Sequence, residues 1–212
     1  MSVVGIVPAG GSGERLGADR PKAFVLLGGR PLLDWSLDAL SEVCDRVVVA
    51  VPEGYEEAPD RVAGGPSRSE SVRNALAAAP EAGVAVVHDA ARPLVTPDLV
   101  RRCLDALVDG VDGAIAAAPV TDTVKEVDED SLVTRTLDRS HLWAIQTPQV
   151  FRAEVLRRAL GDSAETLAAA TDDASLVEAA GGRIVVVEAP PQNIKVTAPI
   201  DLQVAESLIH AD

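Results

Sequence analysis

Short runs of β-branched residues alternate with longer segments of helical periodicity along most of this chain. Strands are expected in five of these runs, at residues 3–7, 46–51, 85–88, 113–117 and 183–187. Apolar residues recur at helical spacing in the segments 32–40, 72–79, 99–107, 155–160, 174–179 and 199–208. Because βαβ units place helices over a parallel sheet, the alternation predicts an α/β fold with a mainly parallel sheet.

The length and composition favour one folded domain that spans residues 1–212. Apolar residues make up 47% of the sequence and charged residues 25%, which supplies both a core and a hydrated surface. A single hydrophobic core is still able to cover a chain of this length.

The net charge of −14 and the aromatic content of 2% restrict the kinds of partner. Nucleic-acid binding rests on clustered Lys and Arg and on aromatic stacking platforms, so we expect no nucleic-acid partner. A small anionic ligand would need a local basic pocket, and a divalent cation would offset its charge.

The two cysteines, Cys44 and Cys103, stand far apart, which indicates neither a disulfide framework nor a CxxC zinc site. The apolar run at residues 2–7 is too short to span a membrane and has no signal-peptide pattern. These features favour a cytoplasmic protein without a membrane partner.

One stretch, residues 120–142, departs from the βαβ alternation. Two strands, at 123–127 and 132–137, flank the polar turn 128–131, which predicts a β-hairpin. A lone two-stranded hairpin is not stable in water. Its apolar face should therefore pack either on its own domain or on another subunit.

A glycine-rich segment, residues 7–17, directly follows the first expected strand. Gly10, Gly11 and Gly13 leave backbone N–H groups free to surround phosphate oxygens, which predicts a phosphate cradle. The segment is not a P-loop, and Leu16 stands where a GxGxxG fingerprint needs its third glycine. A nicotinamide dehydrogenase would also need an acidic residue about 20 positions beyond the glycines, and none stands at the end of a second strand.

Two basic residues, Arg15 and Lys22, belong to the same loop. Phosphoryl-type transfer places extra charge on nonbridging oxygens in the transition state, and preorganised cations stabilise that charge without a covalent nucleophile. We therefore interpret Arg15 and Lys22 as the candidate catalytic residues.

Polar residues also gather at the expected carboxyl end of the third strand. Ligands of open parallel sheets bind beyond these strand ends, which places Asp89 and Arg92 where a substrate would lie. His88 fits a structural role at the strand end better. The turn at 64–71 precedes a helical start, and its hydroxyl groups are able to reach a base or ribose, although a plain helix cap would look the same.

Taken together, the ordered motifs of the chain resemble those of the 2-C-methyl-D-erythritol 4-phosphate cytidylyltransferases. The resemblance extends over nearly the whole sequence and rests on PAGGSGERLG with PK, GGPSRSESV, VHDAARP, TDTVK, LDRSHLW with QTPQVF, TDDAS and NIKVT. It implies a Rossmann-like, doubly wound α/β domain that forms a homodimer through an extended arm, here the hairpin at 120–142.

The resemblance also implies the residues of the site. The nucleotide CTP would be contacted, largely through backbone groups, by Ala9, Gly10, Gly11, Gly65, Ser71 and Ala90. The polyol phosphate would be held by Asp89, Arg92, Thr123, Arg139, Thr171 and Lys195. If the arms are exchanged, Thr123 and Arg139 serve the site of the neighbouring subunit, while Arg15 and Lys22 stabilise the transition state.

The reaction implied is an in-line attack by the substrate's phosphate oxygen on the α-phosphorus of CTP, with release of pyrophosphate. Mg²⁺ would bind mainly through the CTP phosphates, and no residue is assigned as a protein ligand of the metal. Pro66 stands where the family often has an acidic residue, and Gly10 where a second alanine is common. A ribitol 5-phosphate cytidylyltransferase and a protein that binds CTP without turnover remain alternatives.

Overall fold

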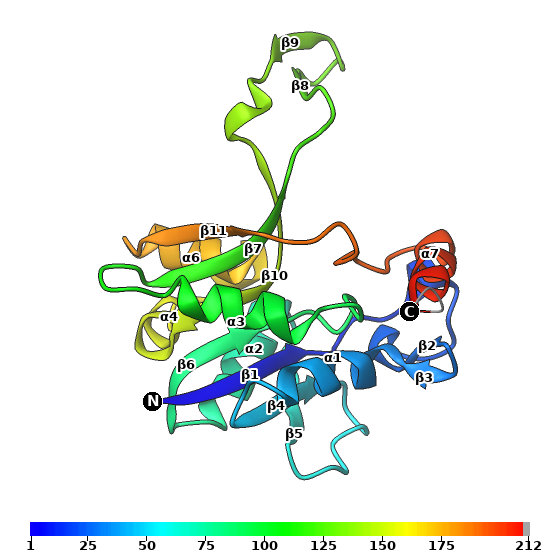
Figure 1. The fold of residues 1–212 in the computed structure, drawn as a ribbon, viewed down its shortest axis with the longest axis vertical. Helices are drawn as coiled ribbons and strands as arrows, with labels where there is room; N and C mark the ends of the chain where they lie inside the picture. Colours follow the sequence, from blue (N-terminus) through cyan, green and yellow to red (C-terminus); the bar gives the residue numbers. More distant parts are fainter. Residues whose placement is uncertain (210–212) are drawn as a thin grey trace.

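The computed structural model describes residues 1–209, and its centre is a seven-stranded sheet (Figure 1). The strands are β1 (Ser2–Pro8), β4 (Arg46–Val51), β5 (Arg61–Ala63), β6 (Ala82–Val87), β7 (Gly113–Pro119), β10 (Trp143–Arg152) and β11 (Ile184–Glu188). They lie in the order β11-β7-β10-β6-β1-β4-β5. The sheet is parallel except at β10, which runs antiparallel to both β6 and β7. This confirms the doubly wound, mainly parallel α/β fold.

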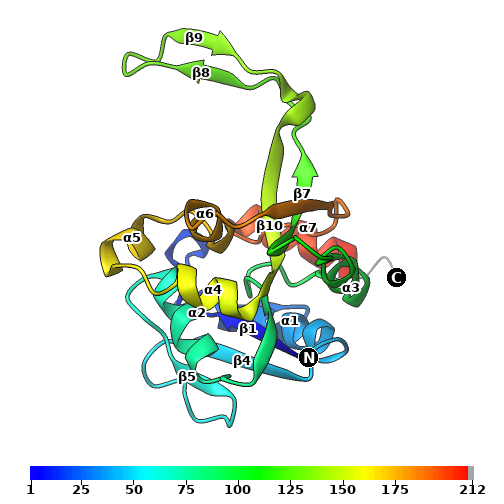
Figure 2. The same cartoon turned by 90° about the vertical axis from the view of Figure 1, so that its left-hand side faces the viewer.

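Seven α-helices accompany the strands of the described chain: α1 (Leu32–Ser41), α2 (Arg68–Ala77), α3 (Pro97–Asp105), α4 (Ala153–Ala159), α5 (Ala164–Ala169), α6 (Asp173–Ala179) and α7 (Pro199–Ile209). Helices α2, α4, α5 and α6 share one apolar core, and α1 and α3 share another (Figure 2). The two cores lie on opposite faces of the sheet because successive strand side chains point in opposite directions. In β4, for example, Val48 belongs to the first core and Val49 to the second.

A third, smaller core forms where the C-terminal helix returns to the N-terminal half. Leu27 and Leu32 pack with Val196 and Ala205 there. Leu27 belongs to a short ladder of β2 (Leu26–Leu27) and β3 (Arg30–Pro31), and Ala205 belongs to α7. This contact brings the segment that carries Lys195 beside the glycine-rich loop.

The order of the strands creates a crevice at the carboxyl end of β1. The chain leaves β1 through α1 on one face to reach β4, and it returns through α2 on the other face to β6, on the opposite side of β1. Ligands of open α/β sheets bind at such a switch point, where the helices on the two faces diverge. The glycine-rich loop and Asp89 follow β1 and β6 directly.

Five strands and helices were absent from the sequence-based expectation: β2, β3, β5, α5 and β10. The omission of β10 matters most because this strand lies inside the sheet. Its sequence is interrupted by Pro148, a residue that argues against a central strand since it lacks an N–H donor. In the structure the register shifts between Ile145 and Gln149, and Pro148 lies within that irregularity.

The hairpin stands away from the body of the protein (Figures 1 and 2). It consists of β8 (Lys125–Val127) and β9 (Val133–Thr136), with a 3-10 turn, η3 (Arg139–His141), before β10. The residues Val127, Leu132 and Val133 are 51%, 64% and 60% exposed. The hairpin is therefore not packed against its own domain.

Among residues 1–209, every helix is too short or too polar to form a membrane span.

Candidate functional site

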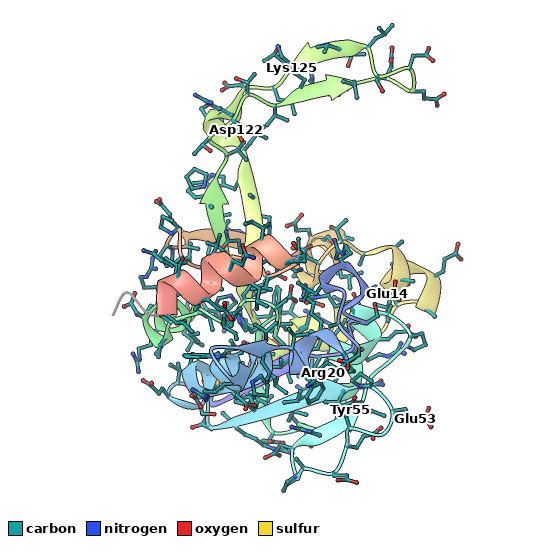
Figure 3. The ribbon with its side chains drawn as sticks, turned by 90° about the vertical axis from the view of Figure 1, so that its right-hand side faces the viewer. Glu14, Arg20, Glu53, Tyr55, Asp122 and Lys125 are labelled. Carbon is teal, nitrogen blue, oxygen red and sulfur yellow. The ribbon has the colours of Figure 1, made fainter. Side chains whose placement is uncertain are left out.

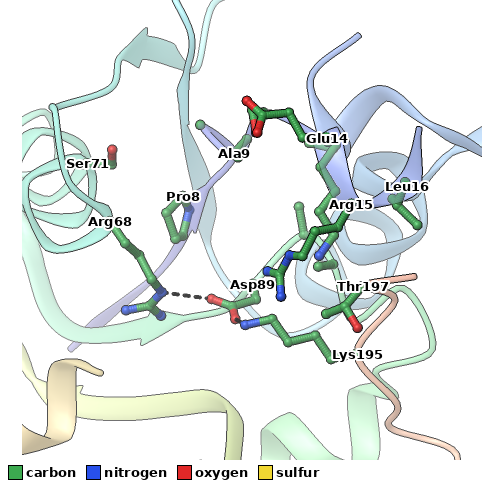
Figure 4. A pocket seen from close by; sticks show the side chains of 18 of the residues that line it. Pro8, Ala9, Glu14, Arg15, Leu16, Arg68, Ser71, Asp89, Lys195 and Thr197 are labelled. Carbon is green, nitrogen blue, oxygen red and sulfur yellow. Dashed lines mark hydrogen bonds and ion pairs between the residues drawn. The ribbon is translucent and has the colours of Figure 1, made fainter. Parts of the chain in front are cut away.

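A cavity of about 570 Å³ opens at the crevice beyond β1 and β6 (Figure 4). Four parts of the chain form its walls: residues 8–16 with Lys22 and Ala23, residues 65–68 with Ser71, residues 89–91, and Lys195 with Thr197. All of the expected nucleotide-binding residues and both candidate catalytic residues line it. The structure thus brings together segments that are far apart in the sequence.

The glycine-rich loop presents a row of free backbone donors. Within residues 1–209, the N–H groups of Gly10, Gly11, Ser12 and Gly13 have no hydrogen-bond partner. The loop is held in shape because the Lys22 N–H donates to the Gly11 carbonyl at 2.9 Å and because Gly13 has a φ of 81°. A Cβ atom at Gly13 would lie 2.8 Å from the Arg20 carbonyl oxygen. Consecutive free N–H groups of this kind form an anion-binding concavity.

Ala9 differs from the glycines that follow it. Its N–H donates to the Ala50 carbonyl oxygen at 2.7 Å. Its backbone N–H is therefore occupied by the sheet, and Ala9 offers a ligand its carbonyl oxygen and its methyl group. Gly10 has room for a Cβ atom, whose nearest neighbour would be the Ser71 hydroxyl at 3.9 Å.

The opposite wall is the N-terminus of α2. Ser67 and Glu70 form a capping box that satisfies free N–H groups at this helix end. The Gly65 N–H donates to the Ser71 hydroxyl at 3.0 Å, and that hydroxyl lies 3.0 Å from the Ser67 carbonyl. A Cβ atom at Gly65 would lie 2.4 Å from Glu70 Cβ, so only glycine permits this close turn.

Basic side chains concentrate in the cavity although the protein is strongly acidic. Arg15, Lys22, Arg68 and Lys195 all line it. The pKa of Lys22 is lowered to about 8, first by burial and then by the positive charges of Lys195 and Arg15. An anion placed among these cations would relieve their mutual repulsion, so the cavity favours a polyphosphate.

Asp89 is the acidic centre of this basic group. It accepts a hydrogen bond from Arg68 Nε at 2.9 Å and another from Lys195 Nζ at 2.7 Å (Figure 4). Burial alone would raise the pKa of Asp89, but the charges of Arg68 and Lys195 hold it well below its usual range. Asp89 is therefore a carboxylate that orients two cations at the cavity wall.

Arg68 is a residue of this site that the sequence did not single out. Its Nη1 donates to Asp173, a fully buried carboxylate, at 2.6 Å, while its Nε binds Asp89. The two acidic partners lie 21 and 105 residues away in the sequence. No motif spacing reveals such a pairing. The one sequence signal for a place in the site was the position of Arg68, at the start of a helix and close to Gly65.

A second cavity of about 540 Å³ adjoins the first and shares Arg68, Asp89 and Lys195 with it. Arg92 and Thr171 line this second cavity. Two cavities that meet at Asp89 and Lys195 are able to hold two ligands side by side.

Two of the expected substrate-binding residues, Thr123 and Arg139, line neither cavity. Both belong to the arm, and the Arg139 guanidinium donates to the Thr121 carbonyl. Figure 3 shows Asp122 and Lys125 high on the arm, far from Glu14 on the body. A site within one chain therefore lacks these two residues.

The described residues contain no group of three or more His, Cys, Asp or Glu side chains that is able to hold a metal ion. Glu14 and Asp89 are the acidic side chains of the first cavity, and Asp89 already accepts from two cations. This donor set fits a magnesium ion that arrives with phosphate ligands rather than one held by protein carboxylates.

The doubly wound sheet, the free N–H groups at its switch point and the surrounding cations define a phosphate-binding α/β protein. Comparison with known proteins specifies the family. The family model described as 2-C-methyl-D-erythritol 4-phosphate cytidylyltransferase matches residues 3–211. The chain therefore belongs to the 2-C-methyl-D-erythritol 4-phosphate cytidylyltransferase family.

Individual relatives match this chain over almost their whole length. The protein of that name from Rhodococcus jostii is 47% identical over 98% of this chain and 95% of its own length, and that from Nocardia farcinica is 45% identical over 98% and 94%. The crystal structure of the Thermus thermophilus enzyme of this name superposes with a TM-score of 0.84 at 36% identity, covering 99% of this chain and all of the other.

The Arg68 pairing generates a stability prediction. Replacing Arg68 by Met would leave the buried Asp173 carboxylate without its cation, and breaking a buried pair in this way costs about 3–5 kcal/mol. We expect urea unfolding at pH 7 to show a loss of this size. The control is Arg73→Met, which removes the more exposed 3.4 Å pair with Glu70 and should cost under about 1 kcal/mol. Equal losses in the two variants would contradict the assignment.

Proposed function

We propose that this protein transfers the cytidylyl group of CTP to 2-C-methyl-D-erythritol 4-phosphate, which yields 4-diphosphocytidyl-2-C-methyl-D-erythritol and pyrophosphate. The observation that carries the proposal is the row of free N–H groups at residues 10–13, which faces Arg15, Lys22 and Lys195. Family membership supplies the identity of the two substrates. The product would enter the non-mevalonate route to isoprenoid precursors.

In this proposal the loop N–H groups and the wall around Gly65, Ser71 and Ala90 bind the nucleotide. The polyol phosphate occupies the adjoining cavity, where Asp89 faces its hydroxyl groups and Lys195 its phosphate. Arg92 and Thr171 add contacts from the far wall. Because the acceptor phosphate is already an anion, its attack on the α-phosphorus needs alignment rather than a strong base.

Arg15 and Lys22 are proposed to stabilise the charge that develops around the α-phosphorus. Both side chains line the nucleotide cavity, and Figure 4 shows Arg15 extending toward the region of Asp89 and Lys195. Both side chains already line the cavity in the unliganded chain, so little reorganisation would be needed as the charge develops. Lys195 would also counter the charge of the attacking phosphate.

We propose Mg²⁺ as the cofactor, bound mainly through the phosphates of CTP. When bound, it neutralises phosphate charge and assists the departure of pyrophosphate. No described carboxylate cluster competes for it, and the cations of the cavity complete the neutralisation.

We further propose that residues 1–212 act as one nucleotidyltransferase domain in a homodimer held by the arms at 120–142. The apolar residues of the arm are exposed in the single chain, where a two-stranded hairpin is not stable by itself. Thr123 and Arg139 line no cavity of their own chain. An exchanged arm would account for both observations. Free, buried Cys44 and Cys103 suit a reducing cytoplasm, where we place the protein.

The reaction is tested by pyrophosphate release with purified protein and Mg²⁺. CTP, UTP and ATP are each assayed against 2-C-methyl-D-erythritol 4-phosphate and against ribitol 5-phosphate. We expect turnover with CTP and the methylerythritol phosphate to exceed every other pair by about tenfold or more. A preference for ribitol 5-phosphate would establish that alternative, and CTP binding without pyrophosphate release would establish a non-catalytic protein.

The role of Lys22 predicts both a rate effect and a pH dependence. Lys22→Ala should lower kcat by about 10²–10³ because a preorganised charge is lost, with a smaller effect on the Kd of CTP. In the unaltered protein kcat/KM for CTP should fall as the pH rises through about 8, because the protonated amine is the active form. Lys22→Arg stays charged, so its residual activity should lack this decline. An unchanged kcat in Lys22→Ala would remove Lys22 from the mechanism.

Exchange of the arms is tested by mixing two inactive variants. Lys22→Ala disables the nucleotide side of a site, whereas Arg139→Ala disables the arm. In a mixed dimer with exchanged arms, one site carries both defects and the other carries neither. We expect remixing after mild dissociation to restore up to about a quarter of the normal activity, because about half of randomly formed dimers are mixed and each has one intact site. Activity no higher than that of the separate variants would show that each arm serves its own chain.

A further inference from the structure

The strongest polar cluster outside the cavities lies directly beneath the Asp89 turn. His88 follows β6 and is fully buried. Its Nε2 lies 3.1 Å from the Arg92 carbonyl oxygen, and its Nδ1 lies 3.1 Å from the Thr147 hydroxyl. The same hydroxyl accepts a hydrogen bond from the Asp89 N–H at 3.0 Å. His88 is thus linked to both ends of the turn formed by residues 89–92.

The direction of each hydrogen bond in this chain follows from its two fixed ends. The Arg92 carbonyl only accepts, so Nε2 of His88 must carry the proton. Burial lowers the pKa of His88 to about 4, so the ring is neutral and its Nδ1 is an acceptor. The Thr147 hydroxyl therefore donates its proton to Nδ1, which leaves its lone pairs for the Asp89 N–H. Each donor in this series of hydrogen bonds, from the Asp89 N–H to the Arg92 carbonyl, therefore has one acceptor.

The same cluster joins the two segments that carry Asp89 with Arg92 and Lys195 to Thr147 of β10. Asn193, also fully buried, donates from Nδ2 to the Thr147 carbonyl at 3.0 Å and accepts at its own carbonyl from Arg92 Nη1 at 2.7 Å. Lys195 lies two residues beyond Asn193. The Arg92 N–H donates to the Asp89 carbonyl at 2.9 Å, which closes the turn.

From these contacts we infer that His88, as its neutral Nε2–H tautomer, is a positioning residue that fixes the Asp89–Arg92 turn for the polyol phosphate. The inference rests on the proposed function for the identity of that ligand. His88 does not line either cavity, so it acts through Thr147 and the backbone rather than by contact with substrate. The nucleotide has additional support from the glycine-rich loop, whose residues 9–13 make no hydrogen bond to His88. Loss of His88 should therefore weaken the polyol phosphate site more than the CTP site.

Two substitutions separate this hydrogen-bonding role from simple packing. Leucine in His88→Leu has about the size of the imidazole ring but leaves the Thr147 hydroxyl and the Arg92 carbonyl without partners. Asparagine in His88→Asn is smaller and leaves a void, but its Oδ1 is able to accept from Thr147 where Nδ1 does. A positioning role requires Asn to function better than Leu, whereas a packing role requires the reverse.

The experiment measures KM for 2-C-methyl-D-erythritol 4-phosphate and for CTP in both variants by pyrophosphate release. We expect His88→Leu to raise KM for the polyol phosphate about tenfold, with a smaller rise for CTP, and His88→Asn to lie closer to the unaltered protein. If Leu functions as well as Asn, or if both KM values rise in parallel, the inference is wrong. Absence of turnover in the unaltered protein would instead refute the proposed function.

A second measurement does not depend on activity or on variants of His88. The chain contains three histidines, and His141→Asn/His210→Asn leaves His88 as the sole one. A long-range ¹H–¹⁵N correlation spectrum at pH 7 then reports which ring nitrogen carries the proton. We expect a protonated Nε2 and a bare Nδ1. A protonated Nδ1 would reverse the hydrogen-bond chain and overturn the inference.

Discussion

The pairing of Asp89 with Arg68 and Lys195 is the interaction on which the rest of the site depends. These residues come from the end of β6, the start of α2 and the segment before α7. Because the Asp89 side chain is only 13% exposed, its negative charge depends on the two cations beside it. The ion pairs thereby join three parts of the fold around a single carboxylate. They also place that carboxylate at the boundary between the two cavities.

This arrangement explains how an acidic protein with a net charge of −14 is able to present a basic site. Long-range attraction does not bring an anion to such a surface, so recognition rests on short-range contacts within the cavity. The free N–H groups of the loop contribute partial charges that do not titrate. The side chains of Arg15, Lys22 and Lys195 add full charges around the same cavity. Partial burial of Lys22 strengthens its interaction with a ligand because less water screens it.

The sequence predicted most of the architecture because the strands and helices that it identified are locally patterned. The five expected strands are all present, and the loop after the first of them carries the free donors that its glycines indicated. The strand β10 was missed because Pro148 and its polar neighbours hide a central strand whose pairing is set by tertiary contacts. Arg68 was missed for a related reason. Its role depends on an ion pair with Asp173, which is remote in sequence and adjacent in space.

The arm carries Thr123 and Arg139, the two proposed substrate residues that line neither cavity of their own chain. The apolar residues Val127, Leu132 and Val133 of this short hairpin are exposed to water, so their surface contributes no hydrophobic stabilisation in a single chain. In the proposed dimer a second subunit would cover them, and the same docking would deliver Arg139 to a defined place. The proposed substrate-binding role of Arg139 would then make an active site conditional on assembly. An isolated chain would then retain its nucleotide cavity, which is complete within one subunit, while the polyol phosphate site would remain unfinished.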